Sequence, residues 1–126
     1  MKAVIIMVAI VAIIGALNGY TGYFIDNSAD ELLSGINEAK QAVQAGDQAA
    51  ASDRVKKLRD GWESVESRWE VLEDHREIDR IDTLMTHLEA MADTGVLDTM
   101  MPELDELAFF LTHIDDKHKI KMENIF

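Results

Sequence analysis

The fold is decided by an uncharged N-terminal stretch, AVIIMVAIVAIIGALNGYTGYFI (residues 3–25), and by the acidic sequence that follows it. A helix of this length spans roughly 34 Å at 1.5 Å per residue, enough to cross a hydrocarbon core of roughly 30 Å. Tyr20, Tyr23 and Phe24 lie near its end, where aromatic side chains favour a membrane–water interface. The sequence predicts a transmembrane anchor at residues 1–25 and a water-facing domain at residues 26–126.

A cleaved secretion signal is the alternative interpretation, because the densest apolar part, residues 3–17, is short. No A-x-A-like cleavage site follows it, so we expect an uncleaved signal-anchor. Lys2 precedes the span, and positive charge favours the cytoplasmic side of a membrane. We therefore expect a single-pass protein of the cell membrane, with the N-terminus cytoplasmic, the C-terminal domain extracytoplasmic and the lipid bilayer as its first partner.

Small residues recur on one face of the anchor at spacings of 3, 4 and 3, namely Ala12, Gly15, Gly19 and Gly22. Within a bilayer, small residues let another helix approach closely, although glycine and alanine are also common in membrane helices generally. The pattern predicts a surface that packs against another membrane protein or against a second copy of this chain.

The rest of the chain has the apolar periodicity of helices and no strand signal. Ser28 and Glu31 have capping-box spacing, which predicts that a first soluble helix begins there and ends near Gly46. A second helix is expected after Asp47, a third over about 78–92 and a fourth over about 98–114, with residues 117–126 docked as a short helix or an extended arm. We expect an all-α protein in which an antiparallel four-helix bundle follows the anchor, with tetratricopeptide-like hairpins as the alternative.

The second of these helices has the strongest pattern in the chain. Its apolar residues alternate between spacings of 4 and 3, as in a heptad seam, and charged residues lie between them. We expect this seam to form the bundle core and each indole N–H to find a partner, with ligand stacking by the tryptophans as the alternative. The seam comprises Val55, Leu58, Trp62, Val65, Trp69 and Leu72, with Ala51 one turn before it.

The net charge of the chain and the absence of several known motifs argue against some classes of function. It has 24 acidic and 12 basic residues and a net charge of −12, which disfavours binding to nucleic acid. It has no cysteine, no phosphate-binding loop and no nucleophile motif, so we expect no cofactor and no enzymatic activity. His75, His113 and His118 lie near carboxylates and are weak candidates for a divalent-metal site. Acidic neighbours are common in so acidic a chain, so solvated or helix-capping histidines are the simpler interpretation.

Several pieces of sequence are shared with a known family: Gly46-Asp47, Trp62 with Trp69, His75 with Glu77-Ile78-Asp79, Glu106-Leu107, Leu111, His113-Ile114 and Glu123-Asn124-Ile125-Phe126. In these the chain resembles domain-of-unknown-function family 4363, a family of small single-span membrane proteins from Gram-positive bacteria. The resemblance implies no activity. Genes of the family lie near that of a multi-span membrane protein, which implies an accessory subunit of a membrane assembly. Asp115 departs from the family pattern, which has a proline there.

The sequence therefore predicts an interaction protein, in which one anchor helix presents a helical bundle outside the cell membrane. A small-ligand or divalent-metal sensing domain is the first alternative, with the histidines and carboxylates as its site. A hydrolase-like enzyme ranks last, because no two catalytic groups are placed together by the sequence.

Overall fold

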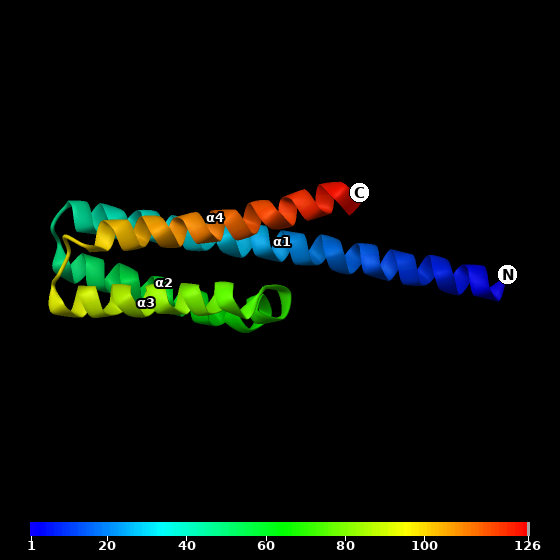
Figure 1. Cartoon of the computed structure of the whole chain (residues 1–126), viewed down its shortest axis with the longest axis horizontal. Coiled ribbons are helices and arrows are strands. Elements are labelled where there is room, and N and C mark those ends of the chain that lie inside the picture. Colours follow the sequence, from blue (N-terminus) through cyan, green and yellow to red (C-terminus); the bar gives the residue numbers. More distant parts are fainter. Residues whose placement is uncertain (126) are drawn as a thin grey trace.

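The computed structural model describes residues 1–125, with side chains through Ile120, and this part of the chain is helical with no strand. The helices are α1 (Lys2–Gln44), α2 (Gln48–Leu72), α3 (His75–Thr94) and α4 (Met100–Ile125). Each helix runs antiparallel to the one before it (Figure 1). The predicted all-α fold is confirmed.

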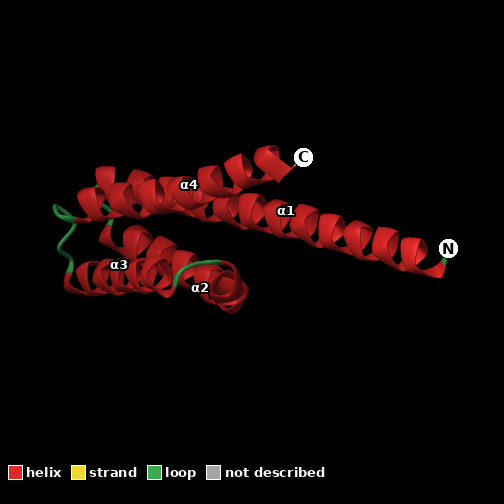
Figure 2. Cartoon of the chain, turned by 45° about the vertical axis from the view of Figure 1, so that its right-hand side comes forward, coloured by secondary structure: helices red, strands yellow, loops and turns green. Residues whose placement is uncertain are grey.

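The helices close into a ring, because α1 packs against α2 and α4, and α3 packs against the same two helices. This arrangement is an antiparallel four-helix bundle. The contact between α1 and α4 distinguishes it from a tetratricopeptide-like array, in which each unit contacts only its neighbours along the chain. The N-terminal part of α1 projects well beyond the α2–α3 pair in both views (Figures 1 and 2).

The helix start predicted at Ser28 is wrong, because α1 continues through this residue without a break. Ser28 is 4% exposed, and its hydroxyl donates to the carbonyl oxygen of Phe24 at 2.7 Å. A serine can make this bond to the preceding turn inside a helix, so its side chain does not cap a new one. The predicted anchor and the first bundle helix are therefore one helix.

The projecting part of α1 is apolar and uncovered. An 18-residue window of this helix has a mean hydropathy of 2.4, and none of the window is buried within the structure. By length and composition α1 can cross a membrane, a test that a signal sequence near the N-terminus also passes. Within the described residues, no other segment buries this surface.

Local signals at the turns explain where the other helices begin and end. The Asp47 carboxylate accepts a hydrogen bond from the Ala50 N–H at 3.0 Å and caps α2, as expected. Gly95 adopts φ +73° and ends α3. The α3 helix begins at His75, earlier than predicted, because the Asp74 carboxylate accepts from the N–H of Arg76 at 2.8 Å.

The C-terminal segment continues α4 instead of forming a separate arm. The helix extends from Met100 to Ile125, well past the predicted end near Ile114, and Pro102 lies in its first turn, where proline is tolerated. Phe126 and the side chains of residues 121–125 lie outside the described part of the structure, so the predicted docking of Ile125 and Phe126 is not placed.

The core is centred on the two tryptophans of α2. Trp62 and Trp69 are fully buried, and their rings meet edge to face with centroids 5.5 Å apart. Of the other predicted seam residues, Ala51, Val55 and Leu58 are buried, while Val65 and Leu72 lie at the margin of the core, packed against it and partly exposed. The heptad pattern therefore identified the inward face of α2 correctly.

Candidate functional site

Charged and aromatic side chains gather where the apolar part of α1 enters the bundle. We call this region the junction; it comprises residues 20–30 of α1, the α2–α3 turn at residues 72–75, and residues 114–120 of α4. It lies at the end of the bundle from which α1 projects (Figure 1). If α1 spans a membrane, the junction is the part of the bundle nearest to it.

A hydrogen-bond chain fixes α1 to α2 at the junction. The indole N–H of Trp69 donates to the Ser28 hydroxyl at 2.9 Å, and that hydroxyl donates to the Phe24 carbonyl oxygen at 2.7 Å. The Arg68 guanidinium lies over the Phe24 ring, 4.6 Å from its centroid. Ile25 is 0% exposed, so the core begins immediately after the aromatic residues of the apolar segment. The projecting segment thus continues into the bundle without a break, and these contacts hold it against α2.

An open groove of about 220 Å³ lies beside this contact, between α1 and the end of α2. Its wall is mostly apolar, and Arg68 is its one charged side chain. The lining residues are Tyr20, Thr21, Phe24, Ser67, Arg68, Val71 and Leu72. Val71 is 83% exposed, so an apolar side chain at the tip of α2 faces outward at the level of Tyr20.

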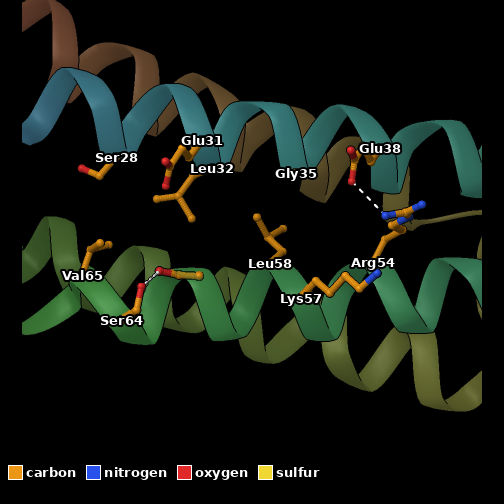
Figure 3. Close-up of a pocket in the computed structure, with 11 residues that line it drawn as sticks. Ser28, Glu31, Leu32, Gly35, Glu38, Arg54, Lys57, Leu58, Ser64 and Val65 are labelled. Carbon is orange, nitrogen blue, oxygen red and sulfur yellow. Dashed lines mark hydrogen bonds and ion pairs between the residues drawn. The ribbon is translucent and has the colours of Figure 1, made fainter.

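A second groove, of about 120 Å³, runs along α1 and α2 from Ser28 in the junction toward the α1–α2 turn (Figure 3). The ion pair between Arg54 and Glu38, 3.0 Å apart, lies at its far end. Leu32 and Leu58 point into the space between the helices (Figure 3). A Cβ on Gly61 would meet Leu32 Cδ2 at 3.6 Å, an ordinary van der Waals contact, so α1 passes close to α2 at this point.

A buried carboxylate ties the α2–α3 turn to α4. The Glu73 side chain is only 1% exposed, and it accepts from Lys117 Nζ at 2.9 Å and contacts Nε2 of His118. Lys117 Nζ also donates to Glu77 Oε2 at 3.0 Å. Burial alone raises the pKa of Glu73, but the hydrogen bonds from Glu77, Lys117 and His118 together hold its pKa below the ordinary value.

A different carboxylate pair lies beside the tryptophans. The Trp62 indole N–H donates to Asp82 Oδ1 at 2.7 Å, so both indoles have the partners that the sequence predicts for buried tryptophans. Glu66 lies next to Asp82, and its pKa is raised to about 7, first by burial and then by the hydrogen bond and negative charge of Asp82. At neutral pH this glutamate is therefore partly protonated.

The histidines predicted as weak metal ligands have separate surroundings. His113 stacks on the exposed Phe109 ring, with centroids 6.1 Å apart, and His118 contacts Glu73. His75 is exposed at the start of α3. Among the described side chains, no group of three metal-binding residues includes any of these histidines.

Three carboxylates come together at the junction instead. Asp26 and Asp30 of α1 and Asp115 of α4 each offer an oxygen, and these oxygens lie within 4.8 Å of one another. The sequence shows that Asp26 and Asp30 are one helical turn apart, but not that Asp115 faces them. Asp115 lies beside them because α4 packs against α1 in the fold.

The stripe of small residues predicted in the anchor lies on the same face of α1 as these carboxylates. Asp26 and Asp30 continue the spacing of Gly19 and Gly22 by further steps of 4, so α4 covers the upper end of this face. Gly15 is half-buried and Ala12 is exposed, while a Cβ on Gly19 would meet no described atom within 4 Å. Gly19 is partly buried, and among the described residues no side chain occupies the space next to its Cα.

A family model described as domain of unknown function DUF4363 matches residues 20–125 of the chain. The match covers the junction and all of α2, α3 and α4, and it leaves out most of the apolar segment. It confirms the family that the sequence resembles, while the Gram-positive origin stays a prediction. No curated protein and no solved structure matches the chain.

Proposed function

The chain belongs to the DUF4363 family, and we propose that it is a membrane-anchored interaction protein, an accessory subunit of a membrane protein assembly. The observation that carries this proposal is the continuity of α1. One helix contributes both an apolar window with no buried residue and the wall of a packed bundle. Apolar surface of this extent is costly in water and is stable in lipid or against another apolar helix.

The orientation that we propose follows from charge. Lys2 lies before the apolar segment, whereas the bundle after it is strongly acidic. Positive charge near a span favours the cytoplasmic side, so the bundle lies on the extracytoplasmic side of the cell membrane. Tyr20 and Tyr23 are both largely exposed and would then lie at the outer interface, where Tyr20 lines the groove beside Arg68.

The small-residue stripe supports a partner helix within the membrane. In the bundle, α4 occupies the face of α1 that carries Asp26 and Asp30. The same face continues toward the N-terminus as Gly19, Gly15 and Ala12. A transmembrane helix of a partner, or of a second copy, would take the position below α4, where small residues permit close contact of the backbones.

The continuous helix through the junction would couple movements within the membrane to the bundle outside it. Because α1 is unbroken and is held by the Trp69–Ser28 hydrogen bond, a rotation or tilt of the span moves the whole bundle. A flexible linker would have isolated the two parts. This coupling supports an accessory role over that of a passive tether.

The alternative function is the sensing of a small ligand or a divalent metal. The observation that favours it is the group of carboxylates of Asp26, Asp30 and Asp115, not the histidines. A metal held there would act on the contact between α1 and α4. It is compatible with an interaction role, because it would change how firmly the bundle closes on the projecting helix.

The test of the interaction role is a Gly15→Ile/Gly19→Ile double variant, expressed with an affinity tag and extracted in mild detergent. We expect it to reach the membrane at wild-type level and to lose the proteins that co-purify with the wild type, because the added bulk prevents close helix contact. The matched control is Ala9→Ile/Ala16→Ile, which adds bulk to small residues about a quarter of a turn around the helix. We expect it to keep the partners.

Two results would contradict the proposal. If the chain is recovered without residues 3–25 from native membranes, as measured by intact mass, the segment is a cleaved signal. If both double variants keep the same partners, the stripe is not the contact. Protease added to intact protoplasts tests the orientation: the bundle should be digested, and its protection would reverse the topology.

A further inference from the structure

Three carboxylates from two helices share a small volume at the junction. One oxygen each from Asp26, Asp30 and Asp115 lie within 4.8 Å of one another. Calcium–oxygen distances are about 2.3–2.6 Å, so two oxygens bound to one ion are at most about 4.8 Å apart when that distance is about 2.4 Å. Three oxygens at that limit lie about 2.8 Å from their common centre, so a small side-chain movement brings all three within bonding distance of one ion.

The buried member of the group has an unsatisfied oxygen. The Asp115 side chain is 8% exposed, yet its Oδ1 has no hydrogen-bond partner. A buried carboxylate oxygen without a partner costs free energy that a bound cation recovers. Burial raises the pKa of Asp115, and the nearby Asp26 carboxylate raises it further, while Lys119 opposes both. The group thus holds more negative charge than its own hydrogen bonds satisfy.

We propose that Asp26, Asp30 and Asp115 bind one Ca²⁺ ion, which clamps α4 to α1 directly above the apolar segment. All three ligands are carboxylate oxygens, which suit hard cations and disfavour metals that prefer nitrogen or sulfur. Three carboxylates can supply up to six oxygens when each binds through both, within the six to eight that Ca²⁺ takes. Mg²⁺ needs a near-ideal octahedron and gives up its waters reluctantly, so it fits less well.

Lys119 occupies this space as an internal competitor. Its Nζ lies 3.1 Å from Asp26 Oδ1 and 3.1 Å from Asp115 Oδ2. The side chain is 55% exposed, so it can turn outward when a divalent ion enters, without disturbing the core. Displacing a bound ammonium weakens the affinity for Ca²⁺, so we expect a dissociation constant of about 10⁻⁴–10⁻³ M, at the weak end of the range for protein Ca²⁺ sites.

The proposed Ca²⁺ site does not depend on whether α1 spans a membrane. An experiment that refutes this site therefore leaves the proposed interaction role untouched, and the reverse also holds. The effect of bound Ca²⁺ would be local. At about ten times the dissociation constant, a ligand that binds only the folded state multiplies the folded-to-unfolded ratio by about 11. Calcium would therefore tighten the closure of the bundle at the junction.

The experiment is a calorimetric titration of CaCl₂ into the full chain in a zwitterionic detergent, paired with thermal unfolding in Ca²⁺ and in EDTA. We compare the wild type with Asp115→Asn, which should bind Ca²⁺ at least tenfold more weakly. The control is Asp105→Asn, because Asp105 also joins α4 to α1, through an ion pair with Lys40, but lies outside the group. It should bind within twofold of the wild type. Lys119→Gln should bind more tightly, by threefold or more.

Thermal unfolding in EDTA separates loss of folding from loss of binding, because Asp115→Asn gives up the Lys119 ion pair but also removes a buried charge, so its melting temperature in EDTA should stay within a few degrees of the wild type. The proposal is overturned if the wild type shows no saturable binding below about 10 mM CaCl₂, above the range of such sites. It is also overturned if Asp115→Asn binds within twofold of the wild type. Equal weakening by Asp115→Asn and Asp105→Asn, with MgCl₂ as effective as CaCl₂, would show screening of the acidic surface instead.

Discussion

Removal of the Trp69 ring should destabilise the bundle more than most single changes can. The ring is fully buried, so Trp69→Ala leaves a large cavity, and such truncations cost about 3–5 kcal/mol. The edge-to-face contact with Trp62 at 5.5 Å is lost as well, which is worth about 0.5–1.5 kcal/mol. The Ser28 hydroxyl keeps its bond to the Phe24 carbonyl, so it adds little to the cost. We expect a total loss of about 5 kcal/mol.

This loss is a large part of the stability of a domain of this size, which is about 5–15 kcal/mol. The measurement is equilibrium urea unfolding of the full chain in detergent, followed by the fluorescence of the remaining Trp62 and by circular dichroism. A fragment that begins at residue 27 is unsuitable, because it lacks Ile25, which is 0% exposed, and the Phe24–Arg68 contact.

The matched control is Val71→Ala, two residues farther along α2, where the side chain is 83% exposed. It should change the free energy of unfolding by less than about 0.5 kcal/mol. Trp69→Phe, which keeps most of the ring but loses the N–H donor to Ser28, should fall between the two. A loss below about 1 kcal/mol for Trp69→Ala would refute the placement of this ring in the core.

Three further changes test other parts of the structure. The pKa of Glu66 is raised in the fold to about 7, so its protonated form stabilises the fold at low pH, and this stability is lost as pH rises through about 7. In urea unfolding, Glu66→Gln should therefore raise the free energy of unfolding by about 1 kcal/mol at pH 8 and change it little at pH 5. Gly95→Ala should lower the melting temperature by several degrees, because φ is +73° and a Cβ would lie 2.8 Å from Gln48 Nε2. Ser28→Ala should cost about 1–3 kcal/mol by leaving the indole N–H of Trp69 unpaired, and an unchanged urea midpoint would contradict that hydrogen bond.

The order of the helices could be predicted because local rules act within a few residues. Asp47 caps α2, Gly95 ends α3, and the heptad spacing around Trp62 marks the buried face. Each of these signals depends on backbone geometry and side-chain period over one or two turns, which are the same in any context. The apolar window of α1 could be recognised for the same reason.

The helix start predicted at Ser28 was wrong because the same short sequence pattern is compatible with two local structures. Serine one turn before a glutamate suits a helix start, and it suits equally a hydroxyl bonded to the preceding turn. The second applies here because Trp69, far away in the sequence, brings its indole N–H to the same hydroxyl. Only the packing of α2 against α1 decides between them.

Composition and apolar period alone predict a helical protein, a segment that can cross a membrane and an acidic bundle, because these properties depend only on residue type and spacing. Only the folded structure shows that the apolar segment and the first wall of the bundle form one continuous helix. It also decided which charges meet: Glu73 with Lys117, and Asp115 with Asp26. Such pairs join residues many turns apart in the chain, and only the closing of α4 onto α1 and onto the α2–α3 turn brings them within reach of one another.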